Sequence, residues 1–177
     1  MDSSYAKNTK SYKEFANKNF SDNQLLKLKK ISEKLGVIFF STPGDYSSLL
    51  RLIKIKMPII KISSGLMNNF PLIEEIIKKR IPIIISTGMA DNHDLNKLGK
   101  FLKKHKSKNI ALLKCTSQYP ANDKDLNLRS MLYMKNKFNC PIGYSDHSIG
   151  DLAPVSAVSC GATVIEKHFT LNKKRKG

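Results

Sequence analysis

Short runs of apolar, β-branched residues alternate with longer amphipathic segments along almost the whole chain. A run that is apolar at nearly every position is typical of a strand buried on both faces, as in a parallel sheet. The runs lie at 37–41, 59–63, 82–86, 110–115, 141–144 and 163–167, and the segments beside them predict helices at 22–35, 45–56, 69–80, 91–105, 125–137 and 150–160. This alternation predicts a parallel sheet, either a closed barrel or a doubly wound open sheet.

Small and polar residues follow every predicted strand, and this feature favours the barrel. A doubly wound sheet concentrates its chemistry at one switch point, whereas a (β/α)8 barrel gathers functional residues at the ends of many strands. The sequence also contains neither a GxGxxG nor a Walker A pattern. We therefore expect an α/β fold, namely an incomplete (β/α)8 TIM barrel with about six of the eight strand–helix units.

Two histidines follow consecutive predicted strands. His147 and His168 are one strand–helix unit apart, so their imidazoles are expected to be neighbours at the barrel mouth. Two histidines with open coordination positions suit a divalent transition metal. The alternative is that each histidine only hydrogen-bonds a strand end. His93 and His105 lie in helical segments, where exposure to solvent is expected.

A lysine and several hydroxyl residues occupy the strand ends. Lys61 ends an apolar strand, and inside a barrel mouth it requires an anionic partner because an unpaired buried charge is costly. A phosphate or a carboxylate would serve, and nearby hydroxyls and backbone N–H groups can cradle its oxygens. The hydroxyl residues are Thr42, Ser64, Ser86, Ser117 and Ser145. Each suits a turn or a cap when taken singly; their recurrence at successive strand ends favours anion binding.

Acidic residues flank these positions. Side chains alternate along a strand, so Glu166 and His168 are expected to share one face while Lys167 takes the other. Glu166 is expected either to orient a metal-bound water or to pair with Lys61, and a purely structural ion pair is the alternative. Asp146 is expected either to fix a histidine tautomer or to cap the next helix.

Tyr119 precedes a proline in the loop after the predicted strand 110–115. The sequence leaves two alternatives for this residue: the Tyr119 hydroxyl contacts a substrate, or the Tyr119 ring packs within the loop.

The net charge of +17 favours anionic partners such as nucleic acid, membrane surfaces or phosphorylated metabolites. Lysine is spread along the chain, however, and no aromatic stacking pattern or basic recognition helix accompanies it. No apolar run approaches the ~20 residues that span a bilayer, and the first residues lack a secretory signal. The three cysteines lack metal-type spacing and are expected to be reduced thiols. We expect a cytoplasmic protein without nucleic-acid or membrane partners.

Six segments carry a resemblance to a known family. They are FFSTP (39–43), KISSG followed by NNFPLIEEI (61–76), IISTGMA (84–90), LLKCTSQYP (112–120), IGYSDHSIG (142–150) and GATVIEKHFTL (161–171). Their order and spacing resemble the N-acetylneuraminate (sialic acid) synthase family, which includes legionaminic and pseudaminic acid synthases. The resemblance implies a (β/α)8 barrel that condenses phosphoenolpyruvate with an N-acetylated amino sugar, such as N-acetylmannosamine. The products are a nonulosonic acid and phosphate. It also implies a homodimer.

The same resemblance implies roles for individual residues. His147 and His168 match the ligands of a divalent metal, Mn2+ or Mg2+. Glu166 and Lys61 match catalytic positions, and Tyr119 matches a position that contacts the sugar. The positions that match phosphoenolpyruvate contacts are Thr42, Lys61, Ser64, Ser86, Ser117, Ser145 and His168.

The sequence also departs from the family pattern. Leu66 stands where the family has glutamate, Ser117 where it has asparagine, and Gly44 where it has an aromatic residue. Residues 1–177 resemble the barrel without its first two strands and without the C-terminal antifreeze-like domain, so a partial barrel domain is expected. Two hypotheses follow: part of an active synthase, or a non-catalytic remnant or subunit fragment that retains phosphoenolpyruvate and metal binding.

Overall fold

A computed structural model describes residues 20–174 of the chain. A sheet of five parallel strands forms its centre, and the strands are β1 (Ile60–Ile62), β2 (Ile83–Ser86), β3 (Ile110–Cys115), β4 (Ile142–Asp146) and β5 (Ile165–Lys167). Their order in the sheet equals their order in the chain. In a doubly wound sheet the order of the strands reverses at a switch point. The described strands show no such reversal, and this strand order is the one found in a barrel.

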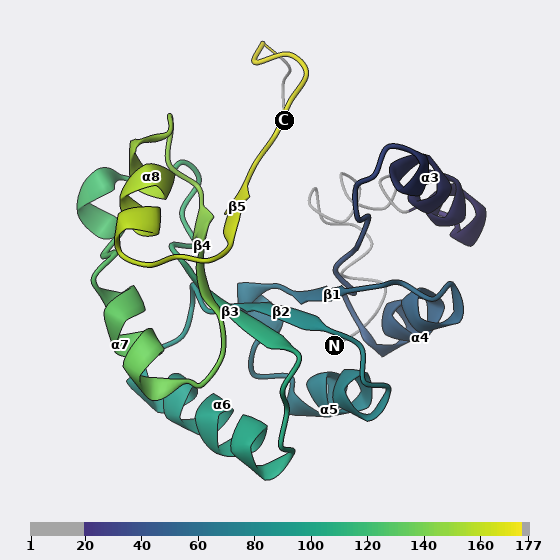
Figure 1. Cartoon of the computed structure of the whole chain (residues 1–177), viewed down its shortest axis with the longest axis horizontal. Coiled ribbons are helices and arrows are strands. Elements are labelled where there is room, and N and C mark those ends of the chain that lie inside the picture. The colour runs from purple at the N-terminus through teal and green to yellow at the C-terminus, as the bar shows by residue number, and fades with distance from the viewer. Residues whose placement is uncertain (1–19, 175–177) are drawn as a thin grey trace, which may run out of the picture.

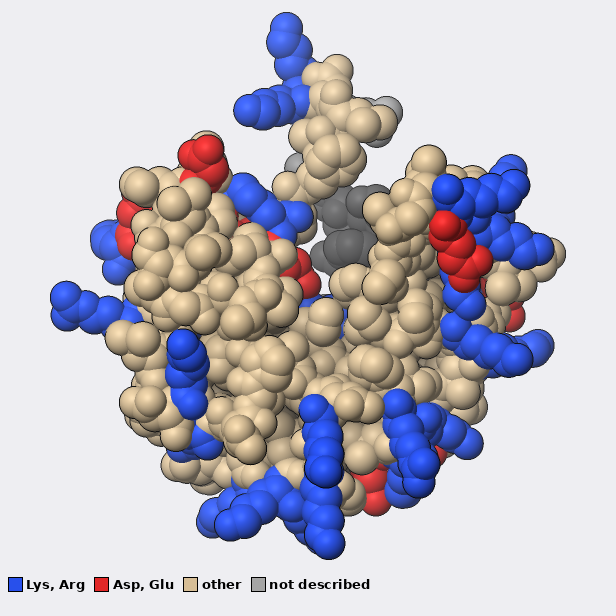
Figure 2. All heavy atoms as spheres, viewed as in Figure 1, with Lys and Arg blue, Asp and Glu red and all other residues tan. Residues whose placement is uncertain are grey.

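Helices cover the outside of the sheet (Figure 1). They are α3 (Asp22–Lys34), α4 (Tyr46–Lys54), α5 (Phe70–Lys78), α6 (Asn92–Lys104), α7 (Ser130–Lys137) and α8 (Leu152–Ser159). Local signals set several of their starts, because Ser21, Asp45 and Asp91 each form a capping box with the residue three positions later. Lysine and arginine side chains project from much of the visible outline, and several gather along its lower edge, where α5 and α6 lie (Figure 2).

The sheet is strongly curled. Lys61 on β1 and Glu166 on β5 form an ion pair with an Nζ–Oε2 distance of 3.3 Å, although β1 and β5 are the two outermost strands. In a flat sheet four strand spacings would separate them by about 19 Å. The side chains meet only because the strands form part of a cylinder, which makes the domain a half-barrel and confirms an incomplete TIM barrel.

The apolar core lies between the sheet and the helices. Alternate strand residues such as Ile60, Ile62 and Ile85 are fully buried, as are Ile73 and Ile76 on α5. Burying a side chain of this size contributes roughly 1.5–3 kcal/mol to stability. This layer fixes the backbone of each strand, and the strand then sets the direction of the polar residue at its end.

The strand predicted at 37–41 is not present, so the prediction of six strands is wrong by one. Only Ser41 forms an isolated bridge, to Ile60, and its carbonyl accepts from the Lys61 N–H at 3.1 Å. Val37 and Ile38 are 56% and 67% exposed. Among the described residues this segment has a neighbour on one side only, and a single bridge does not make a strand.

The helix predicted at 125–137 is also shorter than expected. A 3-10 turn spans Asp123–Asp125, and α7 begins only at Ser130. Asn127 between them has a φ of 43°, a left-handed conformation that interrupts a right-handed helix.

None of the helices in the described range 20–174 is long and apolar enough to cross a membrane.

Candidate functional site

Four side chains from four strands form a continuous polar chain at the carboxyl ends of the strands. The Lys61 ammonium donates to Ser86 Oγ at 2.7 Å and lies 3.3 Å from Glu166 Oε2. Ser145 Oγ donates to the other oxygen, Glu166 Oε1, at 2.7 Å. Lys61, Ser86 and Ser145 are buried, whereas the Glu166 side chain is 38% exposed. The structure therefore holds Lys61 in place inside the mouth, with Glu166 as the counter-ion at its solvent side.

Two further serines converge on Gly88, in the loop after β2. Ser64 Oγ accepts a hydrogen bond from the Gly88 N–H at 2.9 Å. A Cβ at position 88 would lie 2.6 Å from Ser117 Oγ and 2.9 Å from Ser64 Oγ, so no side chain fits without displacing one of them. The bare backbone lets two hydroxyls approach the same point. Sequence reasoning missed Gly88; the available signal was a glycine two residues after the end of a predicted strand.

Three aromatic rings form a cluster beside this polar chain. The ring centroids of His147 and His168 are 5.4 Å apart. Tyr119 stacks on His147 at 3.9 Å and meets His168 edge-on at 5.4 Å. The structure thus brings both histidines to one place, and the Tyr119 ring packs against them. Tyr119 is 67% exposed, and partial desolvation raises the pKa of its hydroxyl above the ordinary value.

A backbone carbonyl fixes the orientation of His147. Its Nδ1 lies 2.7 Å from the carbonyl oxygen of Thr116. A carbonyl only accepts, so Nδ1 carries a proton, and in the neutral ring the lone pair is then on Nε2, which is the tautomer of a histidine that binds a metal through Nε2. Within residues 20–174, no group of three or more His, Cys, Asp or Glu is arranged to hold a metal.

Asp146 has different partners from those expected. It is 1% exposed and accepts from Lys167, from the Ser148 N–H at 2.9 Å and from the Tyr144 hydroxyl at 3.2 Å. Burial alone would raise the pKa of Asp146, but the hydrogen bonds from Lys167 and Ser148 outweigh it and keep this pKa below its usual value. Asp146 neither contacts a histidine nor caps α8; it ties the loop after β4 to Lys167.

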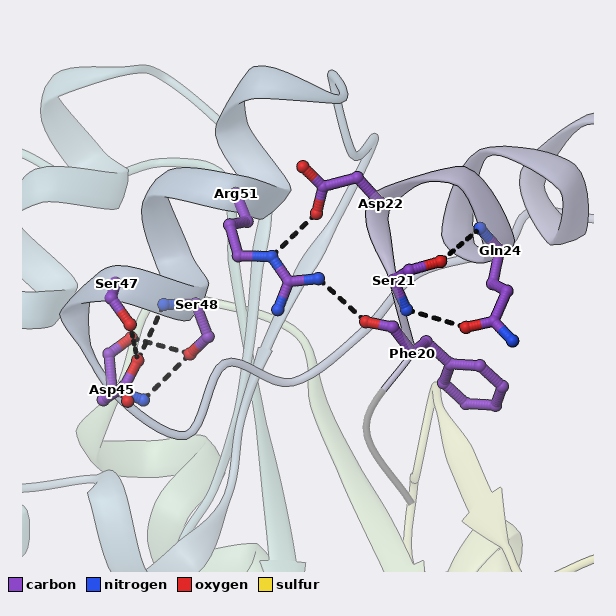
Figure 3. Close-up of polar contacts among 8 residues, drawn as sticks. All are labelled: Phe20, Ser21, Asp22, Gln24, Asp45, Ser47, Ser48 and Arg51. Atoms are coloured by element: carbon purple, nitrogen blue, oxygen red, sulfur yellow. Dashed lines mark hydrogen bonds and ion pairs between the residues drawn. The ribbon is translucent and has the colours of Figure 1, made fainter. Parts of the chain in front are cut away.

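Thr42 and Leu66 stand apart from the polar chain. Thr42 is exposed and makes no side-chain hydrogen bond within the described chain; it borders a shallow cavity beside α3 and α4. Figure 3 shows the contacts that join these two helices, in which Arg51 binds Asp22 Oδ1 at 2.7 Å and the Phe20 carbonyl at 2.8 Å. Leu66 packs against the apolar core and presents no proton-transferring group.

The two remaining histidines differ from each other. His93 is exposed near the start of α6, as expected. His105 was expected to be exposed, but it is partly buried, and its ring centroid lies 4.5 Å from that of Phe101. Both lie away from the cluster of His147 and His168.

Comparisons with known proteins identify the family. The chain matches the NeuB family over residues 1–177. It is 40% identical over 154 residues to the N,N'-diacetyllegionaminic acid synthase of Legionella pneumophila, covering 85% of this chain and 43% of that protein. It is 36% identical over 159 residues to the N-acetylneuraminate-9-phosphate synthase of Drosophila melanogaster, covering 89% of this chain and 43% of that protein.

A solved structure shows the same fold. The chain superimposes on the N-acetylneuraminic acid (sialic acid) synthetase of Leptospira borgpetersenii, solved in complex with citrate, with a TM-score of 0.83 and 39% identity. The match covers 87% of this chain and 54% of that one. The chain spans about half the length of these relatives.

Proposed function

Because this chain belongs to the NeuB family, whose named members are synthases of nine-carbon sugar acids, we propose that it carries the phosphoenolpyruvate- and metal-binding part of such an enzyme. The reaction condenses phosphoenolpyruvate with an N-acetylated amino sugar, N-acetylmannosamine or a relative of it. C3 of phosphoenolpyruvate attacks the aldehyde carbon of the open-chain sugar, water adds at C2, and cleavage of the C–O bond releases phosphate.

The anionic substrate is assigned to the polar chain around Lys61. Phosphoenolpyruvate carries a phosphate and a carboxylate, and the buried Lys61 ammonium provides a fixed positive charge for one of them. Ser86 and the hydroxyls that meet at Gly88 supply pre-positioned donors, and Ser145 holds Glu166 in place beside them. Holding the anion rigidly places its C3 against the second substrate, and this orientation is a large part of the catalysis expected here.

The cation is assigned to His147 and His168. Mn2+ is the preferred ion, because imidazole nitrogen is a better ligand for transition metals than for Mg2+. When bound, the cation supplies Lewis-acid polarisation of the sugar aldehyde. The protein's own contribution is to hold the His147 tautomer through the Thr116 carbonyl and to pack Tyr119 against both rings. Glu166 lies beside Lys61 with one third of its side chain open to solvent, a position that suits orientation of the attacking water.

One observation carries the proposal: a single stretch of chain holds residues of both assigned positions. Glu166 on β5 pairs with Lys61, and His168, the first residue after β5, lies beside His147. The anion and cation positions are thus two residues apart on one backbone. The test is release of inorganic phosphate from phosphoenolpyruvate, with Mn2+ and N-acetylmannosamine, measured against the same mixture without sugar. Sugar-dependent release that disappears in Lys61→Met supports the proposal, and its absence contradicts it for this chain alone.

A second candidate function is binding without turnover. Leu66 supports it, because the resemblance places a glutamate there and leucine transfers no proton. The two functions separate in a complementation experiment, in which phosphate release is measured with and without the N-terminal part of a relative. Turnover that appears only on complementation assigns this chain as one part of a catalyst. Tight phosphoenolpyruvate binding without turnover in either mixture assigns it as a binding remnant.

A further inference from the structure

A groove of about 860 Å3 lies at the opposite end of the sheet from the candidate site, between α6 and the segment that joins α7 to β4. Its lining includes Ile110, the first residue of β3, and Cys140, two positions before β4. These are the amino ends of the strands, whereas the residues assigned to the reaction lie at their carboxyl ends. The groove is therefore separate from the machinery described above, and its volume is within the range of small-molecule sites.

The floor of the groove is apolar. Leu102, Ile110, Phe138 and Cys140 contribute to it, and most of the exposed lining surface is carbon. Burial raises the pKa of the Cys140 thiol to about 11, so this sulfur stays neutral at physiological pH. The floor thus offers an uncharged surface to the apolar part of a ligand.

The rim of the groove is basic. Five lysines line it: Lys100, Lys103, Lys106, Lys108 and Lys137. No aspartate or glutamate belongs to the lining, and none of the five has a salt-bridge partner among the described carboxylates. The ammonium of Lys137 is held in place by Asn96 and by the Tyr133 hydroxyl.

A structural role accounts for only part of this charge. Lys103 and Lys137 lie in the last turns of α6 and α7, where a cation stabilises the helix dipole. Lys100 precedes the last turn of α6, and Lys106 and Lys108 follow that helix. In Figure 2 the lower edge, formed partly by α6, carries a group of such basic side chains. Charges of one sign around an apolar floor are complementary to an anion with an apolar portion.

We propose that this groove binds a small organic polyanion that combines an apolar body with several negative charges. The body covers the floor between Leu102 and Phe138, and the charges meet the lysines of the rim. An inorganic anion would leave the floor exposed, and a neutral apolar ligand would leave the ammonium groups without partners. Lysine is a common ligand of phosphate groups, so the charged part is best represented by phosphates.

Three probes test both halves of the proposal by calorimetry at fixed ionic strength: ATP, tripolyphosphate, which lacks the body, and adenosine, which lacks the charge. We expect ATP to bind at least about tenfold more tightly than either of the others, since each half contributes. Equal affinities for ATP and tripolyphosphate, or no ATP binding at millimolar concentration, would overturn the proposal.

A matched pair of variants locates the binding. Lys100→Ala/Lys103→Ala removes two charges from the rim on α6, and Lys27→Ala/Lys30→Ala removes two exposed charges at the same spacing from α3. We expect the first variant to weaken ATP binding at least about tenfold, because charge-assisted hydrogen bonds are lost, and the second to change it less than about twofold. Equal losses would mean that only the overall net charge attracts ATP, and the groove would then not be the site.

Discussion

Lys61 on β1 and Glu166 on β5 contact each other across the interior of the half-barrel, although three strands lie between them in the sheet. Ser86 on β2 and Ser145 on β4 bind the two members of the pair, one each. The ion pair therefore links the outermost strands and fixes the positive charge of Lys61 beside the Ser86 hydroxyl. The proposed anion site at Lys61 therefore depends on the curvature of the sheet.

Replacement of Lys61 by methionine is expected to reduce phosphoenolpyruvate affinity roughly 10- to 100-fold, since a charge-assisted hydrogen bond contributes roughly 1.5–3 kcal/mol and the anion loses its fixed counter-charge. Stability is expected to change by less than about 1 kcal/mol, because methionine fills the space of the lysine stem and the Glu166 carboxylate left without its partner is 38% exposed and stays hydrated. Calorimetric titration and urea unfolding measure the two quantities. Lys54→Met, on the exposed end of α4, is the control, and equal affinity losses in both variants would refute the assignment.

Replacement of Gly88 by alanine tests the convergence of hydroxyls after β2. The new Cβ would lie 2.6 Å from Ser117 Oγ and 2.9 Å from Ser64 Oγ, so at least one hydroxyl must move. We expect about a tenfold loss of phosphoenolpyruvate affinity, corresponding to about one hydrogen bond. Gly65→Ala is the matched control, because a Cβ there meets nothing within 4 Å. Unchanged affinity in Gly88→Ala would show that these hydroxyls do not bind the anion.

Removal of either histidine tests the cation site. His147→Ala and His168→Ala are each expected to weaken Mn2+ binding at least about tenfold, because each removes one of the two proposed protein ligands. The double variant is expected to bind little more weakly than either single one, since a single remaining imidazole holds the ion poorly. Electron paramagnetic resonance of free Mn2+ measures the affinity. His93→Ala on α6 should behave as the parent protein, and a comparable loss there would argue against this site.

Asp45 caps α4 and makes stability depend on pH. The hydrogen bonds that the carboxylate accepts from the Ser48 N–H and the Ser47 hydroxyl keep the pKa of Asp45 below its usual value (Figure 3). A carboxyl with a depressed folded-state pKa stabilises the fold fully above its unfolded pKa of about 3.9, and this contribution is lost as the pH falls through the folded value. Asp45→Ala should cost about 1 kcal/mol at pH 7 and progressively less toward pH 2.

Urea unfolding between pH 7 and pH 2 measures this effect. Asp45→Asn is the control, because asparagine also caps helices but does not titrate. It should retain most of the stability at pH 7 and lack the pH-dependent part that the parent protein shows. A constant difference between the parent and Asp45→Ala at all pH values would contradict the cap as the source.

Local features were predictable because they depend on neighbours in the chain. The capping boxes at Ser21, Asp45 and Asp91 involve residues three positions apart, and the helices begin next to them. Five of the six apolar runs overlap strands. The run at 37–41 has the same composition but pairs at Ser41 alone, because a strand also needs continuous partners, which composition does not provide.

The sequence by itself determined the alternation of strands and helices, the polar residues at the strand ends and the resemblance that linked them to one chemistry. Only the tertiary structure decided that Lys61 reaches Glu166, that Ser64 and Ser117 meet at Gly88, and that a carbonyl rather than Asp146 orients His147. Capping and burial patterns are set within a few residues, whereas these contacts depend on the twist and curl accumulated over successive strands. No single segment of the sequence contains that curvature.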